Sequence, residues 1–312
     1  MKKKMKMQVV NDMTFRDGCE AYLHDCLTRN LRDGTIKHYK DTIVQLTKYV
    51  DPDMLIMDMD NTTFNEVVVQ LRANKDINDM SLYSYLRDLK TLMYFFMRKE
   101  WLEQFVITVP KADKQPIECY TDAELRLLLA KPKMKDVSFT EYKAWVIVNF
   151  LLSTGIRQNS LSNVKIKDLD LEGGYVHVNV TKNRKPLTIP LNSDMVLILI
   201  EYLKYRGDDP DDYLFCNVYG NKLTKSTLYH TVYDYNKSRG VETTGMHRFR
   251  HTFAKKFIMA GGSPVTLQKV LGHSSLAITE NYLNILVCDL KKDVEEFSIL
   301  AQFKKERISM KR

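Results

Sequence analysis

Histidine, arginine and tyrosine side chains are concentrated between His247 and Tyr282, at spacings that suit chemistry on phosphate. His247 and Arg250 are three residues apart, so on a helix both side chains project from one face and can meet the same substrate oxygens. His273 follows a glycine, and Tyr282 lies in an apolar run that favours a helix. A tyrosine hydroxyl can attack phosphorus and form a covalent ester if cationic groups stabilise the charge that develops on the phosphate. Phosphate chemistry is therefore predicted, with Tyr282 as a candidate nucleophile.

Helix signals indicate how the chain positions these groups. Ser263, with Pro264 at the first helical position, predicts the start of a short helix, and Gly272 predicts its end. His273 then comes immediately after the helix stop. The next apolar run, Leu276 to Leu286, predicts a further helix that would display the tyrosine rather than hold it in a core strand.

A buried helix is predicted farther upstream. Residues Tyr142 to Ser153 form an apolar helical segment fit for burial, and Gly155 and Arg157 follow at its end. Taken alone, such an arginine is usually a surface charge beside a helix cap. Helices are also predicted over Ser193–Tyr205 and Thr227–Arg239.

One β-hairpin is predicted between these helices. Residues Tyr175 to Val180 alternate as a strand, TKNRK forms a turn, and Pro186 to Pro190 returns as a second strand. No other segment is convincing as β-structure. The turn carries Lys182 and Lys185, although a lysine in a hairpin turn is usually just solvated.

The N-terminal third is predicted to be helical throughout. Lysines, arginines and tyrosines are interleaved along it, which fits either solvated helix faces or a surface that faces DNA. From Val109 to Cys119, two prolines and alternating charges predict a linker. The predicted helices are Phe15–Leu31, Thr35–Val50, Thr63–Ala73 and Ser81–Lys99.

Size and composition favour a two-domain protein of the cytoplasm. The chain has 312 residues, enough for two buried cores, and no apolar run long enough to span a bilayer. The basic start is followed by polar residues where a signal peptide needs an apolar core. Five scattered cysteines indicate reduced thiols, and the net charge of +8 favours a polyanionic partner.

Six residues, taken together and in order, resemble the tyrosine recombinase (phage integrase) family. The resemblance is strongest from about Leu151 to Leu286, and the helical N-terminal unit resembles the family's core-binding domain. Each motif alone is common, whereas the ordered set is specific. The six residues are Arg157 within STGIR, Lys182 in the hairpin turn, His247 and Arg250 as HxxR, His273 within LGH, and Tyr282.

The resemblance implies a reaction at a phosphodiester of duplex DNA. Tyr282 would attack the phosphate to give a 3′-phosphotyrosine and a free 5′-hydroxyl, while Arg157 and Arg250 would clamp the non-bridging oxygens. Lys182 would protonate the leaving 5′-oxygen, with Lys185 as a rival for that role. The energy of the phosphoester is kept in the covalent link, so no ATP, metal or other cofactor is expected.

The histidines take assisting roles in the same scheme. His247 would assist proton transfer from the tyrosine or hold a phosphate oxygen, and His273 would hydrogen-bond the phosphate. His251 shares the face of His247 and is expected to pack or to support it. Where the family commonly has a glutamate, three residues after the first arginine, this chain has Ser160, which puts the local support of Arg157 in doubt.

These inferences predict a mainly α fold, with a helical core-binding domain and an α+β catalytic domain that contains a small antiparallel sheet. The two would clamp double-stranded DNA, and affinity should fall steeply with salt. A homo-tetramer would synapse two simple recombination sites, with accessory DNA-bending proteins as further candidate partners and without an arm-binding domain. The expected boundaries are 1–107 for core DNA binding, 108–119 for the linker, 120–290 for catalysis and 291–312 for an amphipathic tail helix that docks on a neighbouring protomer.

Several alternatives remain. Residues 55–63, LIMDMDNTT, mimic the motif of haloacid-dehalogenase phosphatases, with Asp58 as nucleophile and Asp60 as acid beside magnesium, but Asn61 and Thr62 as helix caps explain the segment better. The run DDPDD at 208–212 is expected to be a solvated turn rather than a metal site. A non-cutting DNA-binding regulator and a type IB topoisomerase are further alternatives. Integration and excision of a mobile element is the expected task, with Xer-like resolution of chromosome or plasmid dimers as its alternative.

Overall fold

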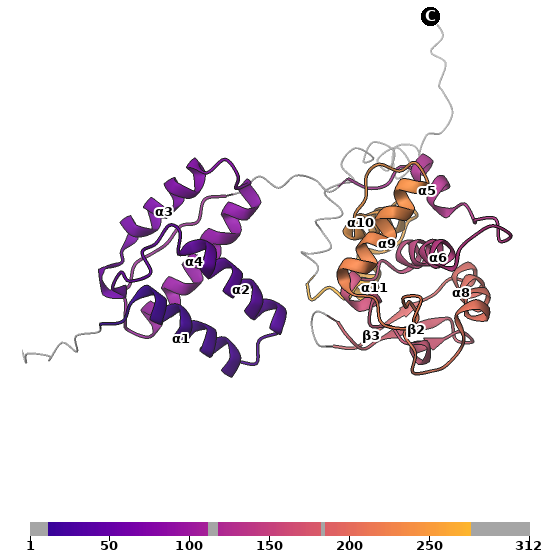
Figure 1. Ribbon diagram of the computed structural model, residues 1–312, viewed down its shortest axis with the longest axis horizontal. Coiled ribbons are helices and arrows are strands. Elements are labelled where there is room, and N and C mark those ends of the chain that lie inside the picture. Colours follow the sequence, from indigo (N-terminus) through magenta and orange to yellow (C-terminus); the bar gives the residue numbers. More distant parts are fainter. Residues whose placement is uncertain (1–11, 112–117, 182–184, 276–312) are drawn as a thin grey trace, which may run out of the picture. The chain divides into compact units, whose positions relative to one another are not determined.

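The computed structural model describes residues 12–111, 118–181 and 185–275. The chain divides into two compact units, Met1–Gln115 and Pro116–Arg312 (Figure 1). Each unit is described by itself. Among the described residues, no helix is both long and apolar enough to cross a membrane.

The first unit is a bundle of four α-helices. Helix α2 packs on α1 and α4, α1 also packs on α4, and α3 packs on α4 (Figure 1). The apolar faces meet in one core that includes Phe15, Cys19, Cys26 and Phe96, so both cysteines pack among apolar side chains. The helices are α1 (Phe15–Thr28), α2 (Asp33–Leu46), α3 (Asn61–Ala73) and α4 (Asp79–Arg98).

A buried carboxylate connects α2 and α4. Asp88 is 1% exposed and accepts a hydrogen bond from the Thr42 hydroxyl (3.0 Å). His38 Nε2 lies 2.7 Å from the same carboxylate. A buried carboxylate is tolerated only where such donors replace water, so this cluster fixes how the two helices pack.

The phosphatase interpretation of residues 55–63 is wrong. Asp58 lies in a short 3₁₀ helix (Ile56–Asp58), and Asp60 is the N-cap of α3, where it accepts a hydrogen bond from the Thr63 backbone N–H (2.9 Å). The cap is therefore Asp60, and not Asn61 and Thr62 as the sequence suggested. Hydrogen bonds from Thr63 and Thr62 lower the pKa of Asp60, as suits an ionised cap rather than a general acid.

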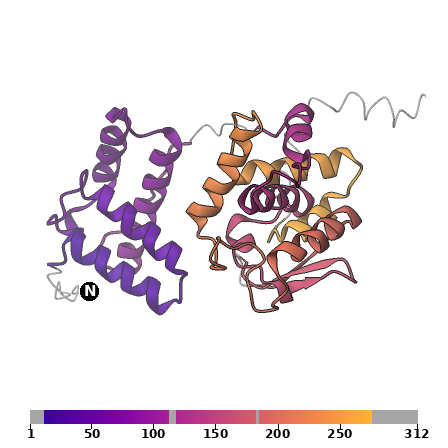
Figure 2. The same ribbon diagram turned by 45° about the vertical axis from the view of Figure 1, so that its right-hand side comes forward.

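The second unit is built around one buried helix. Helix α6 (Phe139–Thr154) packs against α5 (Asp122–Leu129), α8 (Ser193–Arg206), α9 (Lys225–Ser238) and α10 (Met246–Met259), and lies at the centre of this unit (Figure 1, Figure 2). Its buried residues occur on all sides, as expected of a helix that other elements surround.

A small antiparallel sheet and three short helices complete the described part of this unit. The sheet has the order β1–β2–β3, with Tyr175 opposite Pro190 and Val178 opposite Leu187. The predicted hairpin is present with shorter strands, and the third strand was missed because its two residues show no alternation. The elements are α7 (Gln158–Leu161), the 3₁₀ helix Ile166–Asp168, β1 (Leu169–Asp170), β2 (Tyr175–Val178), β3 (Leu187–Pro190) and α11 (Pro264–Leu271).

The acidic run at 208–212 pairs with cations of its own unit. Asp211 accepts hydrogen bonds from Lys167 Nζ (2.5 Å), and Asp212 pairs with Arg206 (3.0 Å). In the described part of the chain, no group of three or more histidine, cysteine, aspartate or glutamate side chains is placed to hold a metal ion.

Candidate active site

Arg250 is buried at the meeting point of three elements. Its side chain leaves α10 and is 4% exposed. Nη1 donates to the Gly155 carbonyl (2.7 Å), and Nη2 donates to the Leu271 carbonyl (2.8 Å). These two bonds fix the plane of the guanidinium against the end of α6 and the end of α11.

Arg157 reaches the same carbonyl from another direction. It is the N-cap of α7, two residues after the glycine that ends α6, and its Nη1 donates to the Leu271 carbonyl (3.2 Å). Two guanidiniums thus share one backbone acceptor. Guanidiniums repel one another, and here backbone acceptors hold them together. Two cations fixed in this way are suited to binding an anion.

His273 lies directly beside Arg250. Gly272 ends α11 with φ 60°, and the next residue turns its ring so that Nε2 lies 2.7 Å from Arg250 Nη2. A guanidinium can only donate, so Nε2 accepts and Nδ1 carries the ring proton. Burial, followed by the charges of Arg250 and Arg157, lowers the pKa of His273 to about 4. The ring is therefore neutral at physiological pH and offers an N–H donor.

Lowering the pH from 7 to 5 is expected to destabilise the wild-type protein more than a His273→Gln variant. A histidine with a pKa near 6.5 when unfolded and about 4 when folded takes up a proton on unfolding between these values, so the free energy of unfolding decreases as the pH falls from about 6.5 to about 4. Glutamine removes this contribution. Urea unfolding at both pH values, followed through Trp145 in a Trp101→Phe background, measures it, because the chain has two tryptophans, one in each unit. Equal pH dependence in the two proteins would contradict the neutral state of His273.

Gly155 forms the tight turn at the end of α6 that allows Arg157 and Arg250 to lie close together. It has φ 59°, and its carbonyl is the acceptor of Arg250. A Cβ at this position would lie 2.5 Å from Phe253 Cδ1 and 2.8 Å from Leu271 Cδ2. The turn therefore needs glycine both for its backbone conformation and for space.

A Gly155→Ala variant is expected to lose about 2 kcal/mol of stability in the second unit and to cleave substrate more slowly per folded molecule, since both strain and overpacking act there. Gly240→Ala is the matched control: φ is 75°, but no atom lies within 4 Å of the added Cβ. Only the backbone cost should remain, about 1 kcal/mol. Equal losses of stability and unchanged cleavage in both variants would show that the contact with Leu271 does not matter.

His247 lies one turn before Arg250 on α10 and is exposed. It lines a hollow of about 520 Å³ together with Gln158 and Tyr229. His251, on the next turn, is half-buried, and its pKa is lowered to about 4 by burial and then by the nearby His247 and Arg250. His247 therefore faces solvent at the rim, while its neighbour stays neutral inside.

The structure brings together three of the six predicted residues: Arg157, Arg250 and His273. His247 lies one turn before Arg250 on α10. Lys182 and Tyr282 lie outside the described residues, as does the predicted tail at 291–312. Lys185, the rival of Lys182, is exposed and lies two residues before β3.

Three contributors were not predicted from the sequence. The Leu271 carbonyl anchors both arginines, the Gly155 carbonyl anchors one, and Ser160 contacts the hairpin. Backbone acceptors have no residue-type signature. The glycine after a buried helix was the one available signal, since glycine is common where a helix ends in the left-handed conformation.

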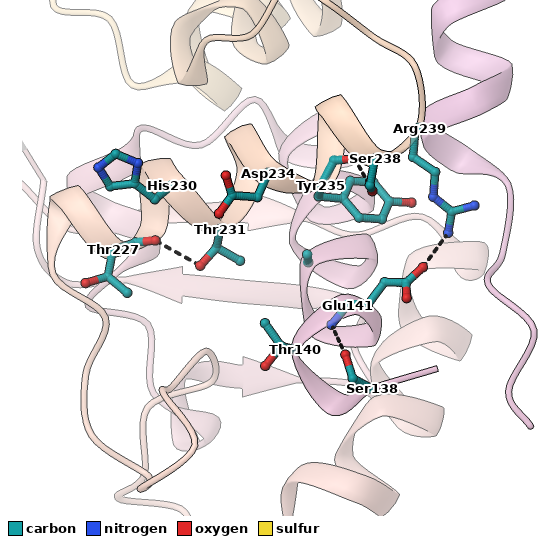
Figure 3. A pocket seen from close by; sticks show the side chains of 11 residues that line it. Ser138, Thr140, Glu141, Thr227, His230, Thr231, Asp234, Tyr235, Ser238 and Arg239 are labelled. Atoms are coloured by element: carbon teal, nitrogen blue, oxygen red, sulfur yellow. Dashed lines mark hydrogen bonds and ion pairs between the residues drawn. The ribbon is translucent and has the colours of Figure 1, made fainter. Parts of the chain in front are cut away.

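A second hollow, of about 540 Å³, lies elsewhere in this unit. It is lined by the first turn of α6 and by one face of α9 (Figure 3), and the four predicted residues that the structure describes are not among its lining residues. Glu141 pairs there with Arg239 (3.3 Å), and the Ser138 hydroxyl caps α6. These contacts belong to the capping of α6 and to its packing against α9.

Comparison with known proteins identifies the family. The Phage integrase family model matches residues 120–287, and the Phage integrase SAM-like domain model matches residues 14–110. Tyrosine recombinase XerA of Pyrococcus furiosus is 31% identical over 239 residues, which cover 75% of this chain and 79% of the relative. A tyrosine recombinase of Pseudothermotoga lettingae is 25% identical over 288 residues, which cover 89% of this chain and 94% of the relative.

The fold agrees with this assignment. The integrase of the transposon Tn1549, solved in complex with transposon right end DNA, has a TM-score of 0.70 and 22% identity, and the match covers 92% of this chain and all of the other. Since one family model spans more than half of the sequence and a relative above 30% identity spans three quarters of it, the chain belongs to the phage integrase family and is a tyrosine-type site-specific recombinase.

Proposed function

We propose that this recombinase cuts and rejoins duplex DNA through a 3′-phosphotyrosine at Tyr282. The observation that supports the site is the convergence of Arg157 and Arg250 on the Leu271 carbonyl, with the neutral ring of His273 beside them. Two fixed cations and an N–H donor are what a phosphate gaining negative charge requires. Electrostatic stabilisation of this kind contributes most when its donors are held in place before the reaction.

The proposed cleavage step exchanges one phosphorus–oxygen bond for another. A bond forms between the Tyr282 oxygen and phosphorus, and the bond between phosphorus and the 5′-oxygen breaks. The tyrosine proton passes to His247 or to water that it holds, and Lys182 gives a proton to the leaving 5′-oxygen, with Lys185 as its rival. Arg157, Arg250 and His273 hold the non-bridging oxygens throughout. Reversal by the 5′-hydroxyl of another strand completes the exchange.

Each part of the chain has a proposed task. Residues 1–107 would bind the DNA core site, 108–119 would link the domains, and 120–290 would carry the chemistry. The amphipathic tail at 291–312 would dock on a neighbouring protomer, so that four protomers synapse two duplexes; accessory DNA-bending proteins would assist. The net charge of +8 supports a partner rich in phosphate.

Two biological tasks fit this chemistry. Integration and excision of a mobile element is the proposed task. Xer-like resolution of chromosome or plasmid dimers is the second candidate, and it is favoured by the name of the Pyrococcus furiosus relative, XerA. The two differ in the DNA on which the protein acts, namely the ends of an element or one site per replicon.

Covalent trapping tests the reaction and identifies the DNA sequence on which the protein acts. The protein is incubated with fragmented, nicked genomic DNA of its source organism, because a nick near the cleavage point lets the freed strand diffuse away and prevents rejoining. Adducts are recovered under denaturing conditions, the attached peptide is identified by mass spectrometry, and the DNA is sequenced. We expect one peptide, which contains Tyr282, and one recurrent sequence.

The other outcomes separate the alternatives. Absence of any adduct would support a non-cutting DNA-binding regulator. Adducts at unrelated sequences, together with relaxation of plasmids that lack a recombination site, would support a type IB topoisomerase. An adduct on a peptide without Tyr282 would overturn the proposed nucleophile.

A further inference from the structure

Side-chain hydrogen bonds hold the end of β2 to neighbouring elements and to the returning chain of the β2–β3 hairpin. Ser160 Oγ donates to the Val180 carbonyl (2.8 Å), and Thr181 Oγ1 donates to the Lys185 carbonyl (2.6 Å). One residue earlier, Asn179 Nδ2 donates to Asp168 Oδ1 (2.9 Å). The strand ladder ends at Val178, so these bonds extend order to the point where the turn begins.

Ser160 also belongs to the short helix that starts at the first arginine. Its backbone N–H donates to the Arg157 carbonyl (2.9 Å), and its side chain is buried, with 6% of the residue exposed. A continuous path of two hydrogen bonds therefore runs from the Arg157 backbone, through Ser160, to the strand end beside the turn. A buried hydroxyl is costly unless it is bonded, which makes the bond to Val180 specific rather than incidental.

The identity of the side chain matters for this path. The acceptor is a carbonyl, so only a donor can bind it, and an ionised carboxylate has no proton to donate. A glutamate at this position could not make the bond. The serine that departs from the family's common glutamate thus provides a different contact, and one that reaches toward the hairpin.

We infer that Ser160 is a positioning residue that fixes Val180, at the strand end that leads into the lysine-bearing turn, relative to the backbone of Arg157. This inference rests on the proposed function, in which a lysine of that turn protonates the leaving 5′-oxygen. A proton donor is effective only within hydrogen-bond reach of the atom that it protonates. Loss of the tie would leave the arginine clamp in place and weaken proton delivery alone.

A substrate with sulfur in place of the scissile 5′-oxygen distinguishes these effects. A thiolate is a far better leaving group than an alkoxide and departs without a proton, so cleavage of the sulfur substrate does not need the lysine. With the ordinary duplex, Ser160→Ala is expected to slow single-turnover cleavage about tenfold. With the sulfur duplex, its rate should lie within about twofold of the parent.

Ser162→Ala is the matched control. This serine is 4% exposed and caps the same short helix, but its hydroxyl donates to the Asn159 carbonyl within that helix. Both substrates should be cleaved at the parental rate. Thr181→Val, which removes the other tie of the turn, should repeat the pattern of Ser160→Ala, and it provides the same test if that variant does not fold.

Lys182→Ala and Lys185→Ala separate failure of the inference from failure of the proposed function. If neither lysine variant recovers on the sulfur substrate, a turn lysine is not the acid and the proposed function fails at that step. Suppose instead that one lysine variant regains the parental cleavage rate on the sulfur substrate. The positioning role of Ser160 is then overturned if Ser160→Ala cleaves the ordinary duplex at the parental rate, or if it is slowed equally on both substrates.

Discussion

A Tyr282→Phe variant is expected to form no covalent adduct, with cleavage reduced by at least about 10⁴-fold, because removal of a nucleophile leaves only binding and electrostatic stabilisation. Phenylalanine keeps the ring and lacks the oxygen that bonds to phosphorus. DNA binding should persist, since the phosphate contacts remain. A gel-shift assay and a denaturing adduct assay, both on the trapped sequence, measure the two properties separately.

Tyr229→Phe is the informative comparison for that result. Tyr229 is 39% exposed and lines the hollow beside His247, so among the described tyrosines it is a rival nucleophile. We expect it to form the adduct within about threefold of the wild-type rate. If its adduct disappears and that of Tyr282→Phe persists, the nucleophile has been assigned to the wrong tyrosine.

Arg250→Lys is expected to lower single-turnover cleavage by about 10²–10³-fold, although it keeps the charge. The guanidinium simultaneously contacts the Gly155 carbonyl, the Leu271 carbonyl and His273 Nε2. A single ammonium cannot reproduce three contacts in one plane, and it cannot also present a fork to phosphate. The position of His273 should loosen with it.

Arg239→Lys is the control: the same substitution is made at a half-buried arginine of the same unit. It pairs with Glu141 at the second hollow (Figure 3), whose lining includes neither Arg157 nor Arg250. Its cleavage rate should remain near that of the wild type. If the two lysine variants were equally active, charge alone would suffice at position 250, and the clamp geometry would not be required.

Local chemistry explains which features the sequence could predict. Ser263, Pro264 and Gly272 specify the start and end of α11 through their own backbone preferences, and the structure confirms both ends. The buried helix before Gly155 was predicted from its apolar residues and is α6. In such places a few adjacent residues determine the conformation.

Tertiary contacts explain what the sequence could not predict. The bond from Ser160 to Val180 joins residues twenty apart, and Leu271 accepts bonds from Arg157, 114 residues away. The low pKa of His273 arises from burial that no neighbour in sequence reveals. The β1 strand exists because its two residues pair with β2, and not because of their own pattern.

Because both arginines bind the Leu271 carbonyl at the end of α11, the number of residues in this helix cannot change without disturbing the site. Each residue of a helix rotates the next by about 100°, so a single insertion between Pro264 and Leu271 would turn this carbonyl away from both guanidiniums and carry His273 with it. Substitutions on the exposed side of α11 leave the direction of this carbonyl unchanged. This helix therefore acts as a spacer whose count of residues, more than their identity, aligns the clamp.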